Sequence, residues 1–246
     1  ITEHTVAIVP VHVYGNVCNV EEIQRIAEKY NLKVIYDAAH AFGVAYKGKG
    51  IGNYGDASIF SFHATKVFNT IEGGAVTFSD HKMYEKLYNL KNFGIRGEEL
   101  VTSVGANAKM NEFCAIMGLC NLKHLDEALK NRQERYDYYR QGLEKVKGIS
   151  FFATNAEATN NFAYFPIIIE DDYGITRDEI YDEFHESNIY ARKYFYPITA
   201  DQACFRNKYK NNKLDVARYI SQRVLILPFY EKMQIGTIDT IIQILR

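Results

Sequence analysis

The sequence of 246 residues contains no tryptophan, only four prolines and only four cysteines. The cysteines are Cys18, Cys114, Cys120 and Cys204, and their spacing matches neither a zinc site nor a disulfide framework. We therefore expect free thiols and no bound metal. Free thiols are usual in a reducing compartment, so the composition predicts a cytoplasmic protein.

The sequence also lacks an excess of charge of either sign, since 29 lysines and arginines face 30 aspartates and glutamates. No basic stretch is dense enough to indicate binding to nucleic acid. No apolar run approaches the roughly 20 residues that a membrane-spanning helix needs, and the first residues carry no basic-then-apolar leader. These absences exclude nucleic acid and membrane as expected partners.

Short apolar runs alternate with amphipathic stretches in the first part of the chain, which predicts an α/β fold. The predicted strands cover residues 6–13, 33–37, 57–62 and 74–78. The predicted helices cover residues 19–30 and 81–93, and a long helical region covers about 111–146. The first two strands should be parallel because a helix connects them. Asn19 is a favourable N-cap for the first helix.

A break at Gly148 predicts two domains, one over residues 1–147 that ends in the long helix, and a smaller α+β domain over residues 148–246. Within the second, Thr176 and Glu179 have the spacing of a capping box, which predicts that a helix begins there.

Polar motifs follow two of the predicted strands. Tyr-Asp-Ala-Ala-His-Ala-Phe-Gly begins at Tyr36, and Ser-Phe-His-Ala-Thr-Lys ends at Lys66. The carboxyl ends of strands in an open α/β sheet face the ligand crevice, and a carboxylate there needs a cationic partner. Apolar residues after Lys66 would help to lower the pKa of its amine, as a Schiff-base nucleophile requires.

A third motif, Glu-Gly-Gly-Ala, begins at Glu72. Taken singly, each motif has a plainer interpretation. Asp37 could be a helix N-cap, Lys66 a surface lysine, and the paired glycines an ordinary turn.

Together the three motifs resemble those of the DegT/DnrJ-type sugar-nucleotide aminotransferases, which are PLP-dependent enzymes of fold type I. The resemblance covers essentially the whole chain and continues through residues 105–112, 192–197 and 223–230. It is nearest to the dTDP-4-keto-6-deoxyhexose aminotransferases. Family members carry an N-terminal third that is not found in this sequence. The resemblance therefore implies an incomplete large-domain sheet with an exposed apolar face, plus a smaller C-terminal α+β domain.

The resemblance also implies roles for individual residues. Lys66 would carry PLP as a Schiff base and move a proton during catalysis. Asp37 would pair with the pyridinium nitrogen, His40 would contact the cofactor ring or its phenolic oxygen, and Ser61 would hydrogen-bond the phosphate. His63 belongs to the same motif and is a secondary candidate.

Two further segments complete the implied site. Asn107 would reach the cofactor of a neighbouring subunit, which implies a homodimer. Arg192, Lys193, Tyr194 and Tyr196 would line the sugar-nucleotide pocket, although an ordinary amphipathic strand end is the alternative interpretation.

The implied reaction transfers an amino group from glutamate to a keto group of a nucleotide-linked deoxysugar, most simply C4 of a dTDP-4-keto-6-deoxyhexose. A catalytically incompetent fragment or remnant of such an enzyme is the alternative. A related PLP-dependent sugar dehydratase is disfavoured because those relatives lack the Schiff-base lysine. A Rossmann dinucleotide site is disfavoured because the glycines between residues 48 and 55 precede a strand instead of opening a helix.

Overall fold

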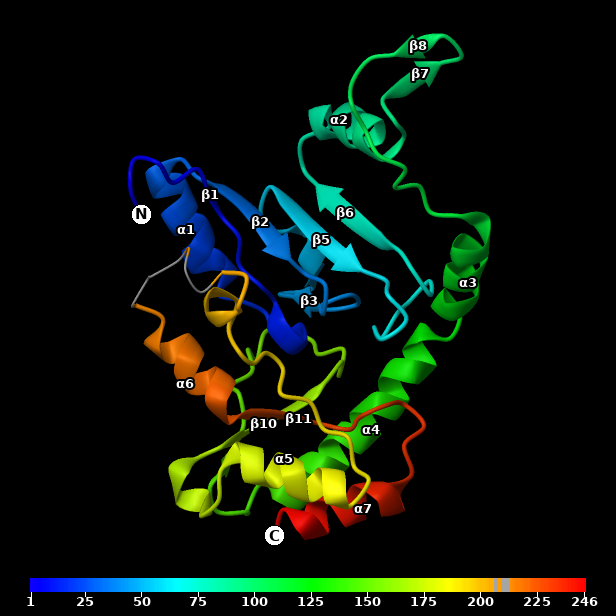
Figure 1. Ribbon diagram of the computed structural model, residues 1–246. Coiled ribbons are helices and arrows are strands. Elements are labelled where there is room, and N and C mark those ends of the chain that lie inside the picture. Colours follow the sequence, from blue (N-terminus) through cyan, green and yellow to red (C-terminus); the bar gives the residue numbers. More distant parts are fainter. Residues whose placement is uncertain (206–207, 209–212) are drawn as a thin grey trace. The chain divides into compact units, whose positions relative to one another are not determined.

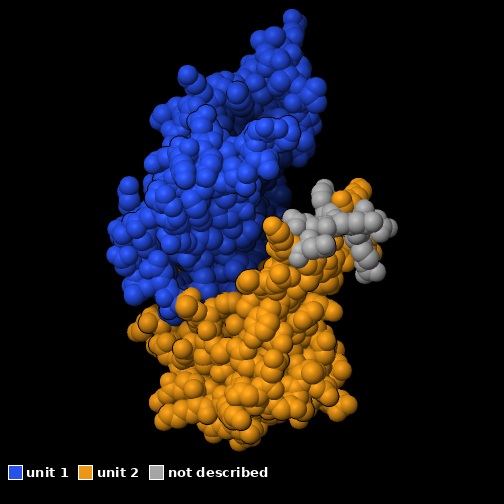
Figure 2. Space-filling view, turned by 90° about the vertical axis from the view of Figure 1, so that its left-hand side faces the viewer, with its two compact units in different colours: residues 1–128, 154–163 blue, residues 129–153, 164–246 orange. Residues whose placement is uncertain are grey.

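The computed structural model describes residues 1–205, 208 and 213–246. It contains two compact units, which Figure 2 colours separately. Unit 1 consists of Ile1–Ala128 and Thr154–Ala163, and unit 2 of Leu129–Ala153 and Tyr164–Arg246. The chain passes from unit 1 to unit 2 within a helix, α4 (Leu125–Leu143). The domain division that the sequence predicts after residue 147 stays a prediction.

A four-stranded sheet, in the order β1-β2-β5-β6, forms the centre of unit 1 (Figure 1). Its strands are β1 (Ala7–Ile8), β2 (Lys33–Asp37), β5 (Ala57–Ser61) and β6 (Gly74–Phe78). β1, β2 and β5 are parallel, as expected for the first two, and β6 is antiparallel to β5. Two short hairpins also belong to unit 1, β3 (Ala45–Tyr46) with β4 (Lys49–Gly50), and β7 (Ile95–Gly97) with β8 (Leu100–Val101).

The strand predicted over residues 6–13 is much shorter in the structure. Pro10 has no N–H group and cannot continue the ladder as a donor. Its carbonyl nevertheless accepts from Asp37 N at 2.9 Å, and His12 N donates to Asp37 O at 2.9 Å. The segment therefore still supports the end of β2 after the regular strand has ended.

The helices of unit 1 are α1 (Val20–Tyr30), α2 (Lys82–Lys91) and α3 (Glu112–Leu122). Asn19 caps α1 by accepting a hydrogen bond from Glu22 N, as predicted. The long helical region predicted over residues 111–146 consists of two helices. Lys123 and His124 form a turn whose N–H groups bond three residues back, which separates α3 from α4 without a glycine or proline.

Side chains alternate across β2, so Val34 and Tyr36 are buried with residues of α1 while Asp37 faces the other side of the sheet. On that other side, Ile59 and Val76 pair across β5 and β6 and remain 46% and 42% exposed. The apolar sheet face expected from the sequence is thus exposed, and Asp37 lies at its edge.

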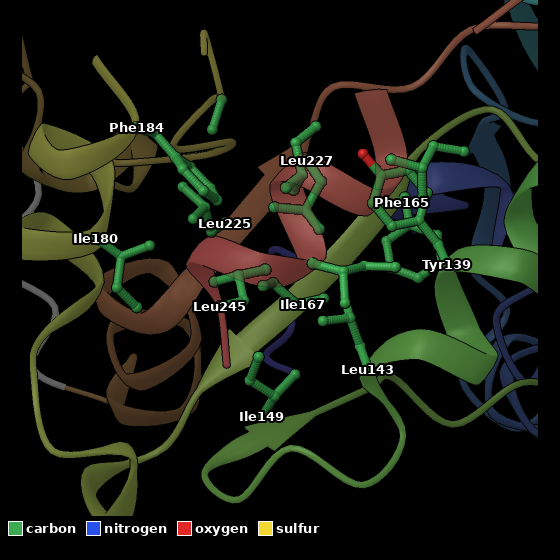
Figure 3. Close-up of a cluster of buried hydrophobic side chains, with 14 of the residues drawn as sticks. Tyr139, Leu143, Ile149, Phe165, Ile167, Ile180, Phe184, Leu225, Leu227 and Leu245 are labelled. Atoms are coloured by element: carbon green, nitrogen blue, oxygen red, sulfur yellow. The ribbon is translucent and has the colours of Figure 1, made fainter. Parts of the chain in front are cut away.

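Unit 2 contains a three-stranded antiparallel sheet in the order β11-β10-β9, formed by β9 (Ile149–Ser150), β10 (Phe165–Ile169) and β11 (Val224–Leu227). Its other helices are α5 (Arg177–Glu186), α6 (Asp215–Arg223) and α7 (Ile235–Ile244). Tyr139 and Leu143 of α4 pack with the sheet residues in a fully buried cluster (Figure 3). The predicted capping box is confirmed, because Thr176 and Glu179 each bond the other's backbone N–H.

None of the helices in the described part of the chain is both long and apolar enough to cross a membrane.

Candidate active site

Asp37 occupies the last position of β2. Its backbone is held on one side by the two hydrogen bonds to Pro10 and His12, and Ala38 N donates to Ile59 O on the other. One carboxylate oxygen, Oδ1, accepts from Ala39 N at 3.0 Å. The carboxylate is only half-buried, which leaves part of it accessible for a cationic partner.

Lys66 lies in the loop between β5 and β6. The loop is closed on itself, because Lys66 N donates to His63 O and Phe62 bonds both Thr70 N and Gly73 O. Burial lowers the pKa of the Lys66 amine, and the negative charge of Asp37 acts in the opposite direction. The amine is therefore less costly to deprotonate than that of an ordinary surface lysine, while it remains in the field of a carboxylate.

His40 lies in the turn that follows Asp37. The backbone N–H of Tyr14 donates to its Nδ1 at 3.0 Å. The pKa of His40 is lowered to about 4, first by burial and then by the positive charge of Lys66, against the opposing charge of Asp37. Because Nδ1 accepts a hydrogen bond, the neutral ring carries its proton on Nε2. Asp37 and Lys66 both influence the pKa of His40, so the three side chains are near enough to interact electrostatically. Their predicted roles at a cofactor site stay a prediction.

An aromatic cluster links the two loops that carry these groups. Phe42, from the His40 turn, stacks on Phe68 with ring centroids 4.5 Å apart, and it meets Phe62 edge to face at 5.3 Å. Phe62 and Phe68 flank Lys66 in sequence, and all three rings belong to the core of unit 1 or pack against it. The cluster fixes the spacing of the two loops, and the sequence motifs gave no indication of it.

The paired glycines of the third motif allow a close approach of the backbone. A Cβ atom at Gly74 would lie 2.7 Å from Phe60 O, and one at Gly73 would overlap the side chains of Thr70 and Met110. The Lys66 loop can return to β6 along this path only without side chains at these positions.

Ser61 and His63 border Lys66 in different ways. Ser61 ends β5 and is half-buried, and its Oγ is 3.4 Å from His63 N. The exposed His63 places Nδ1 2.9 Å from Thr65 Oγ1 and Nε2 3.7 Å from a carboxylate oxygen of Glu72. These contacts close the loop, whereas none of them directs His63 toward Asp37.

Asn107 is exposed in the segment between β8 and α3, where its backbone pairs with Asn92. Its side-chain oxygen accepts from Lys109 Nζ at 3.1 Å. No contact described here joins it to Asp37, His40 or Lys66.

The four predicted substrate residues of unit 2 separate into two pairs. Arg192 donates to the hydroxyl of Tyr194 at 2.8 Å, and the Tyr194 ring lies near that of Tyr164. Lys193 instead contacts Asp178 at 2.5 Å and lies over the ring of Tyr181. The guanidinium of the buried Arg177 lies over the ring of Tyr196. Arg192 and Tyr194 thus form one cluster, and Lys193 and Tyr196 both contact the α5 region.

The sheet of unit 1, whose strands β2 and β5 are followed by the segments that carry Asp37, His40 and Lys66, has the fold of the PLP-dependent sugar aminotransferases of fold type I. The solved structure of DesI in the presence of its TDP-sugar product has a TM-score of 0.92 with this chain at 31% identity, covering 100% of this chain and 62% of DesI. The chain belongs to the DegT/DnrJ/EryC1/StrS aminotransferase family, which it matches over residues 1–246.

Two curated relatives share a name. The dTDP-4-amino-4,6-dideoxy-D-glucose transaminase of Shigella dysenteriae is 43% identical over 246 residues, which are all of this chain and 67% of the relative. The transaminase of the same name from Escherichia coli is 41% identical over 94% of this chain and 63% of its own length. The chain therefore spans about two thirds of the length of these relatives.

The donor set at the site fits PLP. A half-buried amine of lowered pKa suits attachment of an aldehyde, and a carboxylate at a strand end suits a protonated pyridine nitrogen. By contrast, no cluster of three or more histidine, cysteine or acidic side chains in the described ranges could hold a metal ion.

Proposed function

We propose that this protein transfers the amino group of glutamate to a keto group of a nucleotide-linked deoxysugar, with PLP as its cofactor. Its family and the name of its Shigella relative support a dTDP-4-keto-6-deoxyhexose as the acceptor. The observation that carries the proposal is the placement of the half-buried Lys66, in the loop after β5, within the electrostatic field of Asp37 at the end of β2.

Four side chains of unit 1 have different roles in holding and activating the cofactor. When bound, PLP supplies an electron sink for the carbon at which the amino group is exchanged. Lys66 Nζ holds the cofactor and moves a proton to and from that carbon. Asp37 keeps the pyridine nitrogen protonated, since a carboxylate stabilises the cation. His40 offers its Nε2 proton as a hydrogen-bond donor, and Ser61 binds the phosphate.

The remaining roles concern substrate and assembly. Arg192, Lys193, Tyr194 and Tyr196 would line the sugar-nucleotide pocket, and Arg192 is the basic residue of this set that is not bonded to a carboxylate in the described part of the chain. We also propose a homodimer in which Asn107 reaches the partner's cofactor. Apolar side chains on α3 support it, since Phe113 is 84% exposed and such patches mark association surfaces. The four free cysteines support a cytoplasmic location.

The first experiment maps the cofactor. The purified chain is mixed with PLP and reduced with borohydride, and its peptides are searched by mass spectrometry for a pyridoxyl group. We expect the adduct on Lys66, and its loss in Lys66→Ala. Conversion of a dTDP-4-keto-6-deoxyhexose with glutamate then tests the reaction. A folded chain that gives no adduct would overturn the proposal in favour of a catalytically incompetent remnant.

A further inference from the structure

The segment Thr154–Ala163 lies in unit 1, although the residues on both sides of it belong to unit 2. We call it the strap. It runs along residues 45–47, where Thr159 N donates to Ala45 O at 2.8 Å and Thr159 Oγ1 accepts from Ala45 N at 2.8 Å. Lys47 N donates to Glu157 O at 2.9 Å. The strap is thus fixed to the chain just after the His40 turn.

Asn161 connects the strap to the His40 turn itself. Its side chain is 1% exposed, and its amide nitrogen donates to His40 O at 2.8 Å and to Phe42 O at 2.9 Å. Its Oδ1 accepts from Ala163 N at 3.2 Å. A buried amide costs free energy unless its donors are hydrogen-bonded. Both donors of Asn161 are bonded to carbonyls of this turn, so a change in the conformation of the turn would leave them unsatisfied.

The other side of His40 is held by Tyr14 and Gly15. Tyr14 N donates to Nδ1 of the imidazole, and Gly15 has φ +91° with no room for a side chain. A Cβ atom at Gly15 would lie 2.6 Å from Asn161 Oδ1 and 3.3 Å from His40 O. Asn161 and the Tyr14–Gly15 turn therefore hold His40 between them, one through its carbonyl and the other through its ring.

We propose that Asn161 is a positioning residue of the cofactor site, which holds His40 so that Nε2 carries the proton and faces the Asp37–Lys66 edge. The proposal rests on the proposed function, because that function gives His40 its role as a contact of the cofactor. The position of His40 can nevertheless be tested without cofactor. Phe42 extends the effect, because one of the two carbonyls that Asn161 binds is that of Phe42, and the ring of Phe42 packs on Phe62 and Phe68.

The test compares Asn161→Ala with Thr159→Val in the full chain. Both variants remove strap hydrogen bonds, but only the first removes bonds to the His40 turn. Histidine Cε1 signals are followed by NMR against pH without PLP, with His40→Gln to assign the resonance. We expect the apparent pKa of His40 to rise toward its ordinary value in Asn161→Ala and to stay near 4 in Thr159→Val. PLP affinity should fall about tenfold or more in Asn161→Ala alone.

The outcomes separate the two proposals. Equal His40 titration in wild type and Asn161→Ala would overturn the positioning role, whatever the affinity for PLP. Equal changes in both variants would show that Asn161 only stabilises the strap, and this result would also overturn the positioning role. Absence of a pyridoxyl adduct on wild-type Lys66 would refute the aminotransferase proposal while leaving the NMR comparison valid. Melting temperatures of both variants show whether each is folded.

Discussion

The ammonium group of Lys193 lies 2.5 Å from Asp178 Oδ1, so this cation is paired with a carboxylate of unit 2. The side chain of its neighbour Arg192 instead donates to the hydroxyl of Tyr194. Two adjacent basic residues thus have different surroundings. We therefore expect them to differ in their effect on substrate binding.

Arg192→Gln should raise the KM for the nucleotide sugar by about tenfold or more, because a charged hydrogen bond is lost. Lys193→Met should leave that KM nearly unchanged and lower the free energy of unfolding by less than about 1 kcal/mol, as for a partly exposed ion pair. Steady-state kinetics and chemical denaturation measure the two effects. Equal increases in KM would show that both cations meet the substrate.

Asp37→Asn should reduce turnover by about 100-fold or more, because the cofactor nitrogen would lose its anionic partner. The pKa of Lys66 should fall further, since the charge of Asp37 raises it. Asp56→Asn is the matched control. Asp56 accepts from Val34 N at 2.9 Å at the opposite end of the same strand pair, so it should affect stability alone. Comparable loss of turnover in both variants would contradict the assignment.

Acid should destabilise the protein through the buried imidazole of His12 and the half-buried imidazole of His40. The pKa of His12 and that of His40 are both lowered to about 4 in the fold, mainly by burial. Between pH 4 and 6.5 the unfolded chain binds more protons at these groups, so the free energy of unfolding rises with pH in this window. Each histidine should contribute on the order of 2 kcal/mol between pH 7 and 4.5.

Urea denaturation across this window measures the slope. His12→Asn is the informative variant, because the Asn Oδ1 can still accept the hydrogen bond that Cys18 N donates to His12 Nδ1 at 3.0 Å. Its pH dependence should be shallower than that of the wild type. An unchanged slope would show that His12 titrates normally.

Ile71, in the Lys66 loop, has φ +68° and is 47% exposed. A β-branched side chain is strained in this left-handed conformation. Ile71→Gly should raise the free energy of unfolding by about 0.5–1 kcal/mol. This is the difference between the backbone strain that is relieved and the conformational entropy that glycine adds to the unfolded chain. A lowered melting temperature would mean that the isoleucine side chain contributes more by contact than its backbone costs.

Gly148 and Gly174 both have left-handed backbones, with φ +77° and +105°, but they differ in the space around them. A Cβ at Gly148 would overlap the backbone of Tyr173, and one at Gly174 would meet nothing within 4 Å. Gly148→Ala should therefore cost more than about 2 kcal/mol, and Gly174→Ala about 1–2 kcal/mol. The difference in stability between the two variants, measured by thermal unfolding, gives the steric contribution at Gly148.

Local signals in the sequence predicted much of this fold. The strand at residues 33–37, the Asn19 cap and the Thr176 capping box depend on neighbouring residues, and all three are found. The grouping of Asp37 with Lys66 followed from the rule that strand ends share an edge. The break after Leu122 was missed because both helices continue one apolar periodicity through the turn.

The rest of the site depends on contacts between distant residues. Asn161 bonds a carbonyl 121 positions earlier, in a polar stretch that has no motif of its own. The different partners of Arg192 and Lys193 likewise depend on which side of the chain each residue faces. Neither feature could be read from composition or spacing, because both follow from the return of remote segments.

The strap also has a genetic consequence. Unit 1 is not one continuous stretch of codons, since ten of its residues are encoded after the start of unit 2. Recombination that exchanged the codons for residues 1–128 with those of a relative would combine a foreign His40 turn with the resident Asn161. Residues 38–47 and 154–163 should consequently be inherited as a matched set, and hybrids that separate them should lose fitness even where every site residue is preserved.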